Sequence, residues 1–326
     1  MAIANTFDAE IPEEEHDDVA AEQSYRRLLA KLSQQSVVKH FDAYADIPWD
    51  DPAFAIVPTD PRFELAADHP LASTVWYQSQ PQALRARLGL HMVATFMRLG
   101  WEFESVLKRG LLDFARTLPE GAPEFRYVYH EIIEEAQHSL MFREAVARTG
   151  LETRTPGILR RTQQRVTSFG RRFPELFLMF VLSGEDPIDW YQRRELQSGR
   201  QHHPLLERIS RIHTTEEARH MAFARHYLRR TVPKLNTLKR LHLRLHTPII
   251  LKIASMLMLR PSQFLVRTYG IPKEALAQAY GPGSIGECWA LAALRKPREL
   301  CWELGILDDR WSWYWRRLGI WAPRGA

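Results

Sequence analysis

The pentapeptide Glu-Glu-Ala-Gln-His at residues 134–138 returns, with one change, as Glu-Glu-Ala-Arg-His at residues 216–220. Each copy contains a Glu-x-x-His pair. Residues three apart on an α-helix share one face, so each pair can direct a carboxylate and an imidazole to the same point. Two such helices, each partnered by a helix that donates one further glutamate, form the carboxylate-bridged two-metal site of ferritin-like bundles. The repeat therefore predicts an all-α, ferritin-like helical bundle. Its predicted metal ligands are Glu135 with His138 and Glu217 with His220.

A further glutamate precedes the first copy of the repeat. Steps of three and four residues from Glu104 meet an almost wholly apolar stripe, whereas the stripe through Glu102 contains Thr95, Gly110 and Asp113. A carboxylate on a core-facing stripe is costly unless a cation compensates it, which favours Glu104 as the ligand and leaves Glu102 as the alternative. The apolar stripe through Glu104 consists of Val93, Phe96, Met97, Gly100, Leu107, Leu111 and Phe114.

A matching glutamate precedes the second copy. Glu185 follows Leu178, Val181 and Leu182 on one helical face. It lies 32 residues before Glu217, and Glu104 lies 31 residues before Glu135. The matched spacing indicates a duplicated helix pair and makes Glu185 the second partner.

One histidine breaks the symmetry between the two copies. His213 lies four residues before Glu217, one turn away on the same face, whereas the equivalent position before Glu135 is Glu131. We expect His213 to be a seventh metal ligand, with an ordinary polar contact to Glu217 as the alternative.

Three more glutamates belong near the predicted site. Metal-bound imidazoles usually donate their second N–H group to a carboxylate, which orients the ring. Glu134 and Glu216 are candidates for this role, with exposed surface carboxylates as the alternative, and Glu131 is a third candidate.

Composition narrows the class of protein. The chain has 326 residues, of which 45% are hydrophobic and 25% charged, as in a soluble globular protein. A net charge of +5 does not by itself indicate nucleic-acid binding, which would need a clustered basic face, so we expect no nucleic-acid partner. Cys288 and Cys301 are the only cysteines, which excludes a disulfide framework or a four-cysteine metal site and favours a reducing cytoplasm.

Targeting and membrane signals are weak in the sequence. The N-terminus lacks the basic start and apolar core of a secretory signal. The most apolar run, residues 248–259, is too short to cross a bilayer and contains Lys252. We therefore expect a cytoplasmic protein without a transmembrane segment.

Prolines and glycines divide the chain into segments. We expect residues 1–20 to be a solvated tail and the proline-rich residues 45–81 to be an extended lead-in. The predicted divisions are a partly disordered tail and first helix (1–40), a ferritin-like two-metal bundle (41–232) and a helical extension packed on it (233–326). Helices are expected at 82–114, 123–149, from about 163, at 174–198 and at 204–230. The tryptophan-rich C-terminus is expected to pack against the bundle rather than to bind a cofactor.

These motifs resemble those of the AurF-type diiron oxygenases, the family of p-aminobenzoate N-oxygenase. The resemblance rests on Glu-Ala-Gln-His at 135–138, on His-Thr-Thr-Glu-Glu-Ala-Arg-His at 213–220, and on the isolated Glu104 and Glu185. The His-x-x-x-Glu-x-x-His arrangement is its specific part, because generic ferritin-like proteins lack the additional histidine. The resemblance covers about residues 40–230.

The resemblance implies an enzyme with two irons that bind O₂ when reduced and insert oxygen into an amine or a C–H bond of a small organic substrate. It implies an external electron donor such as a ferredoxin or a reductase. Carboxylates and imidazoles suit iron or manganese, so manganese is the alternative metal. The alternative functions are a ferritin-like ferroxidase or iron-handling protein and a manganese-catalase-like peroxide scavenger. A monomer or homodimer would favour the oxygenase, whereas a cage-sized assembly would favour iron storage.

An oxygenase also needs a dry cavity beside its metals, because a reactive iron–oxygen species exposed to water is wasted. We expect an apolar substrate pocket whose wall is drawn from the apolar neighbours of Glu104 and Glu185. These neighbours are Phe96, Met97, Phe103, Leu107, Phe177, Phe180 and Val181.

Overall fold

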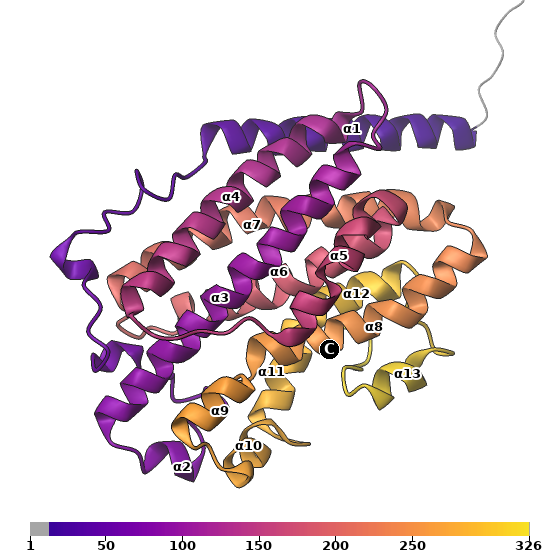
Figure 1. Cartoon of the computed structure of the whole chain (residues 1–326). Coiled ribbons are helices and arrows are strands. Elements are labelled where there is room, and N and C mark those ends of the chain that lie inside the picture. Colours follow the sequence, from indigo (N-terminus) through magenta and orange to yellow (C-terminus); the bar gives the residue numbers. More distant parts are fainter. Residues whose placement is uncertain (1–12, 326) are drawn as a thin grey trace, which may run out of the picture.

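Four long helices form the centre of the molecule. The computed structural model describes residues 13–325, and within that range it contains helices and no β-strand. In Figure 1 the four helices run across the molecule, with the first pair packed together and the second pair packed together. The predicted all-α, ferritin-like bundle is confirmed. The four helices are α3 (Gln82–Ala115), α4 (Pro123–Thr149), α6 (Pro174–Gln197) and α7 (Pro204–Thr231).

Proline and glycine set the ends of these helices. Proline occupies the first helical position of α4, α6 and α7, where its missing N–H group would have no intrahelical partner. Helix α4 ends at Gly150, which adopts a left-handed conformation with φ of 63° that glycine tolerates without steric cost. The four helices therefore lie within one or two residues of the ranges predicted from the sequence.

Two predicted boundaries are wrong. Helix α1 (Glu13–Val38) starts inside the segment expected to be a tail, and residues 1–12 of that tail lie outside the described residues. This helix is held by its apolar side, since Tyr25, Leu29 and Leu32 are buried in the central core cluster. Helix α5 (Gly157–Arg172) starts directly after Pro156 rather than near residue 163, since Leu159 is buried in an apolar cluster with Leu99 and Val106 of α3.

Helix α5 lies directly on α3. A Cβ atom added to Gly170 would lie 2.0 Å from the carbonyl oxygen of Gly110, so the two backbones touch at this crossing. Between the N-terminal helix and the bundle, the proline-rich lead-in forms only short helical turns. These are η1 (Pro52–Phe54), η2 (Pro61–Phe63) and α2 (Val75–Gln78).

The C-terminal third packs on the bundle. Leu243, Leu251 and Leu300 belong to the same buried cluster as Phe177 of α6, and Trp315 is fully buried there. The tryptophan-rich end therefore packs, as expected, although Trp313 is 60% exposed. The proposed division between residues 232 and 233 falls at the turn η3. The elements are η3 (Val232–Lys234), α8 (Thr237–Leu259), α9 (Gln263–Tyr269), α10 (Lys273–Tyr280), α11 (Ile285–Ala293), α12 (Arg295–Glu303) and α13 (Ser312–Arg317).

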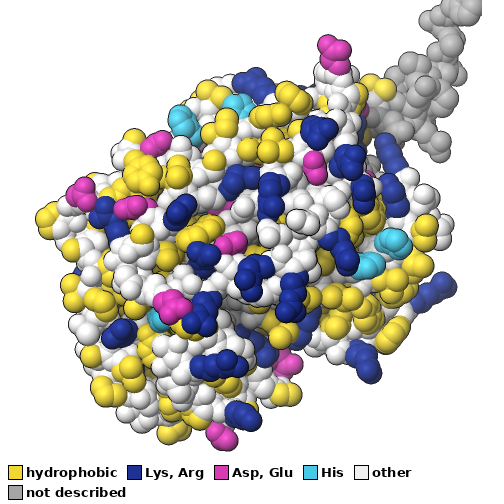
Figure 2. Space-filling model, viewed as in Figure 1, with side chains coloured by type: hydrophobic (Ala, Val, Ile, Leu, Met, Phe, Trp, Pro, Cys, Tyr) yellow, Lys and Arg dark blue, Asp and Glu magenta, His cyan; other side chains and the backbone are white. Residues whose placement is uncertain are grey.

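One segment is more apolar than the sequence analysis allowed. The stretch Thr237–Tyr269, which includes α8, is long and apolar enough to cross a membrane by length and composition, and only 28% of its most apolar window is buried. Figure 2 shows hydrophobic side chains gathered at the right of the molecule, in the region of α8. Length and composition alone are weak evidence for a membrane span, because core helices of soluble proteins also have them.

Candidate metal centre

The four bundle helices bring all seven predicted ligands together. Each of these side chains is at most 3% exposed. They form two groups, and within each group the possible metal-binding atoms lie within 4.8 Å of one another. The first group is Glu104 of α3, His138 of α4 and His213 of α7, and the second is Glu135 of α4, Glu185 of α6, and Glu217 and His220 of α7.

Glu135 and Glu217 belong to the second group and also lie beside His138 of the first. His138 Nδ1 is 3.6 Å from Glu135 Oε2 and 3.5 Å from Glu217 Oε1. His220 Nδ1 is 2.9 Å from Glu135 Oε1 and 3.4 Å from Glu217 Oε2. Each carboxylate thus has one oxygen beside each imidazole, which is the arrangement of two bridging carboxylates between two metals.

The unsatisfied atoms at the centre are those that a metal pair would bind. Among the described residues, Glu104 Oε1, His138 Nδ1, His220 Nδ1, Glu217 Oε2 and both oxygens of Glu135 and Glu185 are buried without a hydrogen bond. Buried polar atoms without partners are rare and costly. Ligand atoms about 2.1 Å from one metal lie roughly 3.0–3.5 Å apart, close to the separations found here. The residues therefore fit a two-metal cofactor.

The geometry distinguishes Glu104 from Glu102, the alternative ligand on α3. Glu104 is 3% exposed, and its Oε1 lies 3.9 Å from His213 Nε2. Its other oxygen accepts a hydrogen bond from Ser139 Oγ at 2.8 Å. Glu102 points elsewhere, forming an ion pair with Arg98 at 2.9 Å and accepting a hydrogen bond from Thr155. The structure places only Glu104 at the centre.

The two histidines of the repeat are held by carboxylates from the opposite copy. His138 Nε2 lies 2.8 Å from Glu216 Oε2, and His220 Nε2 lies 2.8 Å from Glu134 Oε2. Since a carboxylate accepts, each Nε2 carries a proton, and each Nδ1 is the ring nitrogen that faces the centre. Glu134 and Glu216 thus occupy the orienting positions that the sequence analysis gave them, with the two contacts crossing between α4 and α7.

The single change in the repeat gives its fourth position two different roles. Arg219 is buried and donates hydrogen bonds to Glu134 at 2.7 Å and to Glu216 at 3.4 Å, so one guanidinium neutralises both orienting carboxylates. Gln137, its counterpart, binds the lead-in: it accepts from Ala43 N and donates to Asp42. The sequence analysis missed both roles, although the substitution within the repeat marked the position.

His213 is oriented by a residue that the sequence analysis did not identify. Its Nδ1 lies 2.8 Å from Gln192 Oε1 of α6, and its Nε2 lies 3.2 Å from Glu217 Oε1. With Gln192 accepting, Nε2 is left free to bind a metal. Gln192 lies seven residues after Glu185, two helical turns along the same face, which is the signal that could have found it.

Burial and crowding shift the acidities of these groups. Burial raises the pKa of Glu104 to about 8, and the neighbouring Glu135 carboxylate contributes to the rise. Burial lowers the pKa of His213 to about 4, so its imidazole is neutral. Burial opposes protonation of His138, yet its contacts with Glu135, Glu216 and Glu217 raise its pKa well above the usual range. Divalent cations would take the place of these protons.

Glu131 is buried at the edge of the site but lies in neither ligand group. Neither of its oxygens has a hydrogen-bond partner among the described residues. Burial raises its pKa to about 8, which His220 partly offsets and Glu135 reinforces. This carboxyl is therefore suited to hold a proton next to His220.

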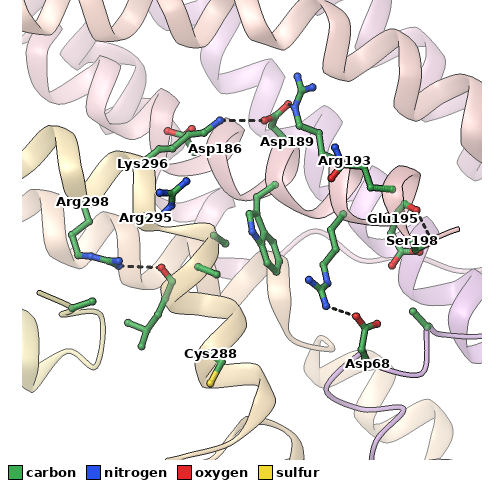
Figure 3. Close-up of a pocket in the computed structure, with 18 of the residues that line it drawn as sticks. Asp68, Asp186, Asp189, Arg193, Glu195, Ser198, Cys288, Arg295, Lys296 and Arg298 are labelled. Carbon is green, nitrogen blue, oxygen red and sulfur yellow. Dashed lines mark hydrogen bonds and ion pairs between the residues drawn. The ribbon is translucent and has the colours of Figure 1, made fainter. Parts of the chain in front are cut away.

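One cavity touches the centre, and two others lie along the helices that carry the ligands. A void of about 10 Å³ touches five of the ligands and is closed by Gly100, Phe103, Leu107 and Ile188. A second cavity of about 100 Å³ lies behind Gln192, with Phe96, Met97 and Trp289 in its wall. A charged cleft of about 1030 Å³ lies between α6 and α12, where Asp189 contacts Lys296 (Figure 3).

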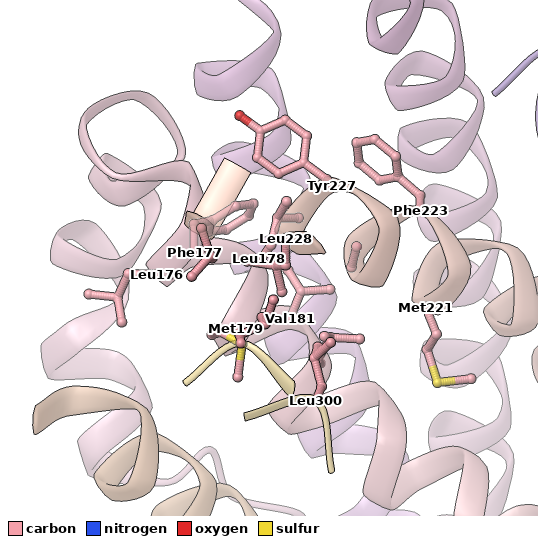
Figure 4. Close-up of a cluster of buried hydrophobic side chains, with 14 of the residues drawn as sticks. Leu176, Phe177, Leu178, Met179, Val181, Met221, Phe223, Tyr227, Leu228 and Leu300 are labelled. Atoms are coloured by element: carbon pink, nitrogen blue, oxygen red, sulfur yellow. The ribbon is translucent and has the colours of Figure 1, made fainter. Parts of the chain in front are cut away.

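Four of the seven residues named for the wall of a substrate pocket line a cavity near the ligands. Phe96 and Met97 line the cavity of about 100 Å³, and Phe103 and Leu107 line the small void. Phe177 and Val181 instead pack in the central core with Leu228 of α7 (Figure 4), and Phe180 packs against that core. Phe177 and Phe180 lie eight and five residues before Glu185, on other faces of α6. Val181 lies one turn before Glu185 on the same face, but it packs in the core and lines neither cavity.

Comparison with known proteins assigns the chain to a family. The family model described as p-aminobenzoate N-oxygenase AurF matches residues 22–305, which extends well beyond the residues 40–230 that carried the resemblance in the sequence. Proteins of Mycobacterium bovis and of two Mycobacterium tuberculosis strains, each described only as uncharacterized, are 34% identical over 302 residues, covering 92% of this chain and 88% of theirs. No solved structure matches the chain. The chain belongs to the AurF family of p-aminobenzoate N-oxygenase, whose fold is ferritin-like and whose centre is a diiron site.

Proposed function

We propose that the protein is an O₂-dependent diiron monooxygenase acting on an amine or a C–H bond of a small, largely apolar substrate. The observation that carries the proposal is the buried set of three imidazoles and four carboxylates whose unsatisfied atoms converge. Each turnover would transfer one oxygen atom of O₂ to the substrate and reduce the other to water, using two electrons and two protons. The electrons would come from an external donor such as a ferredoxin or a reductase.

Seven residues would hold the metals. The donor set of nitrogen and oxygen atoms suits iron, with manganese as the alternative. The metal pair would supply O₂ activation. The residues that would hold the pair are Glu104, Glu135, His138, Glu185, His213, Glu217 and His220.

The surrounding residues would keep the centre rigid and dry. Glu134 and Glu216 hold two imidazoles in the orientation required for metal binding, and Arg219 neutralises both carboxylates. Phe103, Leu107 and Ile188 exclude water from the void beside the ligands. Glu131 is placed to hold a proton near His220.

The cavity behind Gln192 is our candidate for the substrate site. Its wall is mainly apolar, including Met92, Phe96 and Met97, and its polar groups include Gln192 and Glu195. An apolar cavity with few polar groups orients a ligand by those groups and binds it mostly through its apolar surface. Gln192 touches both this cavity and His213, which makes it the contact between substrate site and metal site.

The reaction can be tested directly. The chain is loaded with iron anaerobically, reduced, mixed with candidate amines and apolar compounds, and exposed to ¹⁸O₂. We expect a product heavier by one labelled oxygen atom, found by mass spectrometry, and gel filtration as a monomer or dimer. A cage-sized particle that mineralises iron would identify a storage protein instead. Peroxide removal by the manganese form, without substrate oxidation, would identify a scavenger.

A substitution at His213 should separate metal binding from oxygen chemistry. We expect His213→Ala to fold and to retain most of its iron, because six ligands remain, but to react with O₂ more slowly since one metal loses an imidazole. Circular dichroism and iron analysis report the first two properties, and stopped-flow absorption reports the third. Stopped-flow traces identical to those of the wild type would exclude His213 as a ligand.

A further inference from the structure

The outer face of α8 exposes a continuous row of apolar side chains. Its members follow one another at steps of three, four, four and seven residues, which places them on one side of the helix. Single exposed leucines need no explanation, but a contiguous apolar row on a surface marks a site of association. The row consists of Leu238, Leu241, Leu245, Ile249 and Met256, which are 64%, 40%, 37%, 37% and 45% exposed.

The opposite face of α8 is buried against the bundle. Leu243, Thr247 and Leu251 are buried, and α8 packs along α6. The helix is therefore apolar on both sides, which explains why its composition passes for a membrane span. Because its inner face is committed to the bundle, α8 can meet a membrane only by lying along its surface.

Cations flank the row, and the two helices that form this face contain no acidic residue. Helices α5 and α8 have neither Asp nor Glu. The two helices approach each other at their ends: Leu159 at the start of α5 belongs to an apolar cluster against which Leu257 and Met258 of α8 pack, and Lys239 Nζ of α8 lies 5.4 Å from the ring centroid of Phe173 just after α5. Dark-blue side chains are interspersed across this side of the molecule in Figure 2. Arg244 of α8 is paired with Asp308 at 3.0 Å. The other cations on the two helices are Arg160, Arg161, Arg165, Arg171, Arg172, Lys239, Arg240 and Lys252.

Helix α13 adds an aromatic edge to the same face. Tyr314 donates a hydrogen bond to the carbonyl oxygen of Leu245 at 3.3 Å, which fixes α13 beside the row. Trp313, the preceding residue, is 60% exposed, and Arg316 and Arg317 follow it. Exposed tryptophan next to basic residues is typical of segments that lie at the lipid headgroup level.

We propose that the outer face of α8, together with the flanking cations of α5 and Trp313 of α13, docks on an anionic lipid bilayer. The apolar row would enter the boundary between headgroups and acyl chains, and the arginines and lysines would contact lipid phosphates. A second copy of the chain fits this face less well, because a symmetric contact would set these cations against each other. An acidic protein would complement the cations but not the long apolar row, whereas an anionic bilayer complements both, so we favour the bilayer.

The position of this face relates it to the cavity behind Gln192. Met258 and Leu259, at the end of α8, line that cavity. A bilayer-bound α8 would thus place the cavity wall next to the lipid surface. The docking proposal does not depend on the oxygenase function, because lipid binding is measured without turnover.

Vesicle co-sedimentation of the full chain tests the proposal. We expect binding to vesicles of phosphatidylglycerol and phosphatidylcholine, and roughly tenfold weaker binding to pure phosphatidylcholine. The variant Ile249→Glu should reduce binding to anionic vesicles roughly tenfold or more, since it places a carboxylate within the row. The double variant Arg161→Glu, Arg165→Glu should bind anionic vesicles more weakly than the wild type, and its binding should change less with salt concentration.

The matched control is Ile133→Glu. Ile133 is 56% exposed on α4, a helix distant from α8 in Figure 1, so this change should leave vesicle binding unaltered. Absence of binding to anionic vesicles, or an equal loss in Ile133→Glu and Ile249→Glu, would overturn the proposal. Conversion of a dimer to a monomer by Ile249→Glu, without vesicle binding by the wild type, would overturn it in favour of a second copy.

Discussion

Replacing Glu217 with glutamine is expected to remove both irons from the protein. The two oxygens of Glu217 lie beside His138 Nδ1 and His220 Nδ1, so this carboxylate serves both metal positions. An amide is neutral and supplies only one good ligand atom, which leaves each position one negative oxygen short. Iron analysis after anaerobic loading and desalting should fall from roughly two irons per wild-type chain to well below one.

Two variants on α3 provide the controls. Glu102→Gln should retain both irons, because Glu102 is engaged with Arg98 and Thr155 away from the centre. Glu104→Gln should lose iron mainly from the position shared with His138 and His213. Iron loss in Glu102→Gln but not in Glu104→Gln would show that the assignment on α3 is reversed. Full iron content in Glu217→Gln would contradict the bridging arrangement.

The sequence was sufficient to predict which seven side chains converge at the centre of the bundle, because the patterns that indicate them are local. On a helix, the two residues of a Glu-x-x-His pair lie on the same face. The two copies of the pair, with Glu104 and Glu185 at matched distances, imply four helices that face one point. Burial then separated Glu104 from Glu102, since only a residue on an apolar stripe turns toward the core.

Contacts between distant segments could not be predicted in this way. The crossed pairing of Glu134 with His220 depends on how α4 and α7 pack, and no spacing within either helix specifies it. The spacing from Glu185 places Gln192 on the inward face of α6, but it does not specify that its partner is His213 of α7. The exposed row on α8 could not be predicted from the sequence, because the buried and exposed faces of this helix are both apolar. Its hydrophobic pattern therefore does not indicate which face packs on the bundle.

Changing Arg219 to glutamine makes the second copy of the repeat identical to the first, and it is expected to destabilise the protein strongly. Arg219 is 5% exposed and is the cation that contacts both Glu134 and Glu216. Burial raises the cost of charge on Glu134, and the contacts with His220 and Arg219 more than offset it, lowering its pKa. Removing one partner of a buried ion pair typically costs about 3–5 kcal/mol, because the remaining charge stays buried.

The matched control lies on the same helix. Arg211 pairs with Glu207 at the surface and its side chain is 61% exposed, so Arg211→Gln should change the free energy of unfolding by less than about 1 kcal/mol. Urea unfolding of the metal-free chain, followed by circular dichroism, measures both variants. A large decrease in the free energy of unfolding that is confined to Arg219→Gln would mean that Arg219 neutralises the two carboxylates that orient both imidazoles. Equal, small losses in the two variants would mean that Glu134 and Glu216 are neutralised by the histidines alone, and that the change from Gln to Arg within the repeat has no structural role.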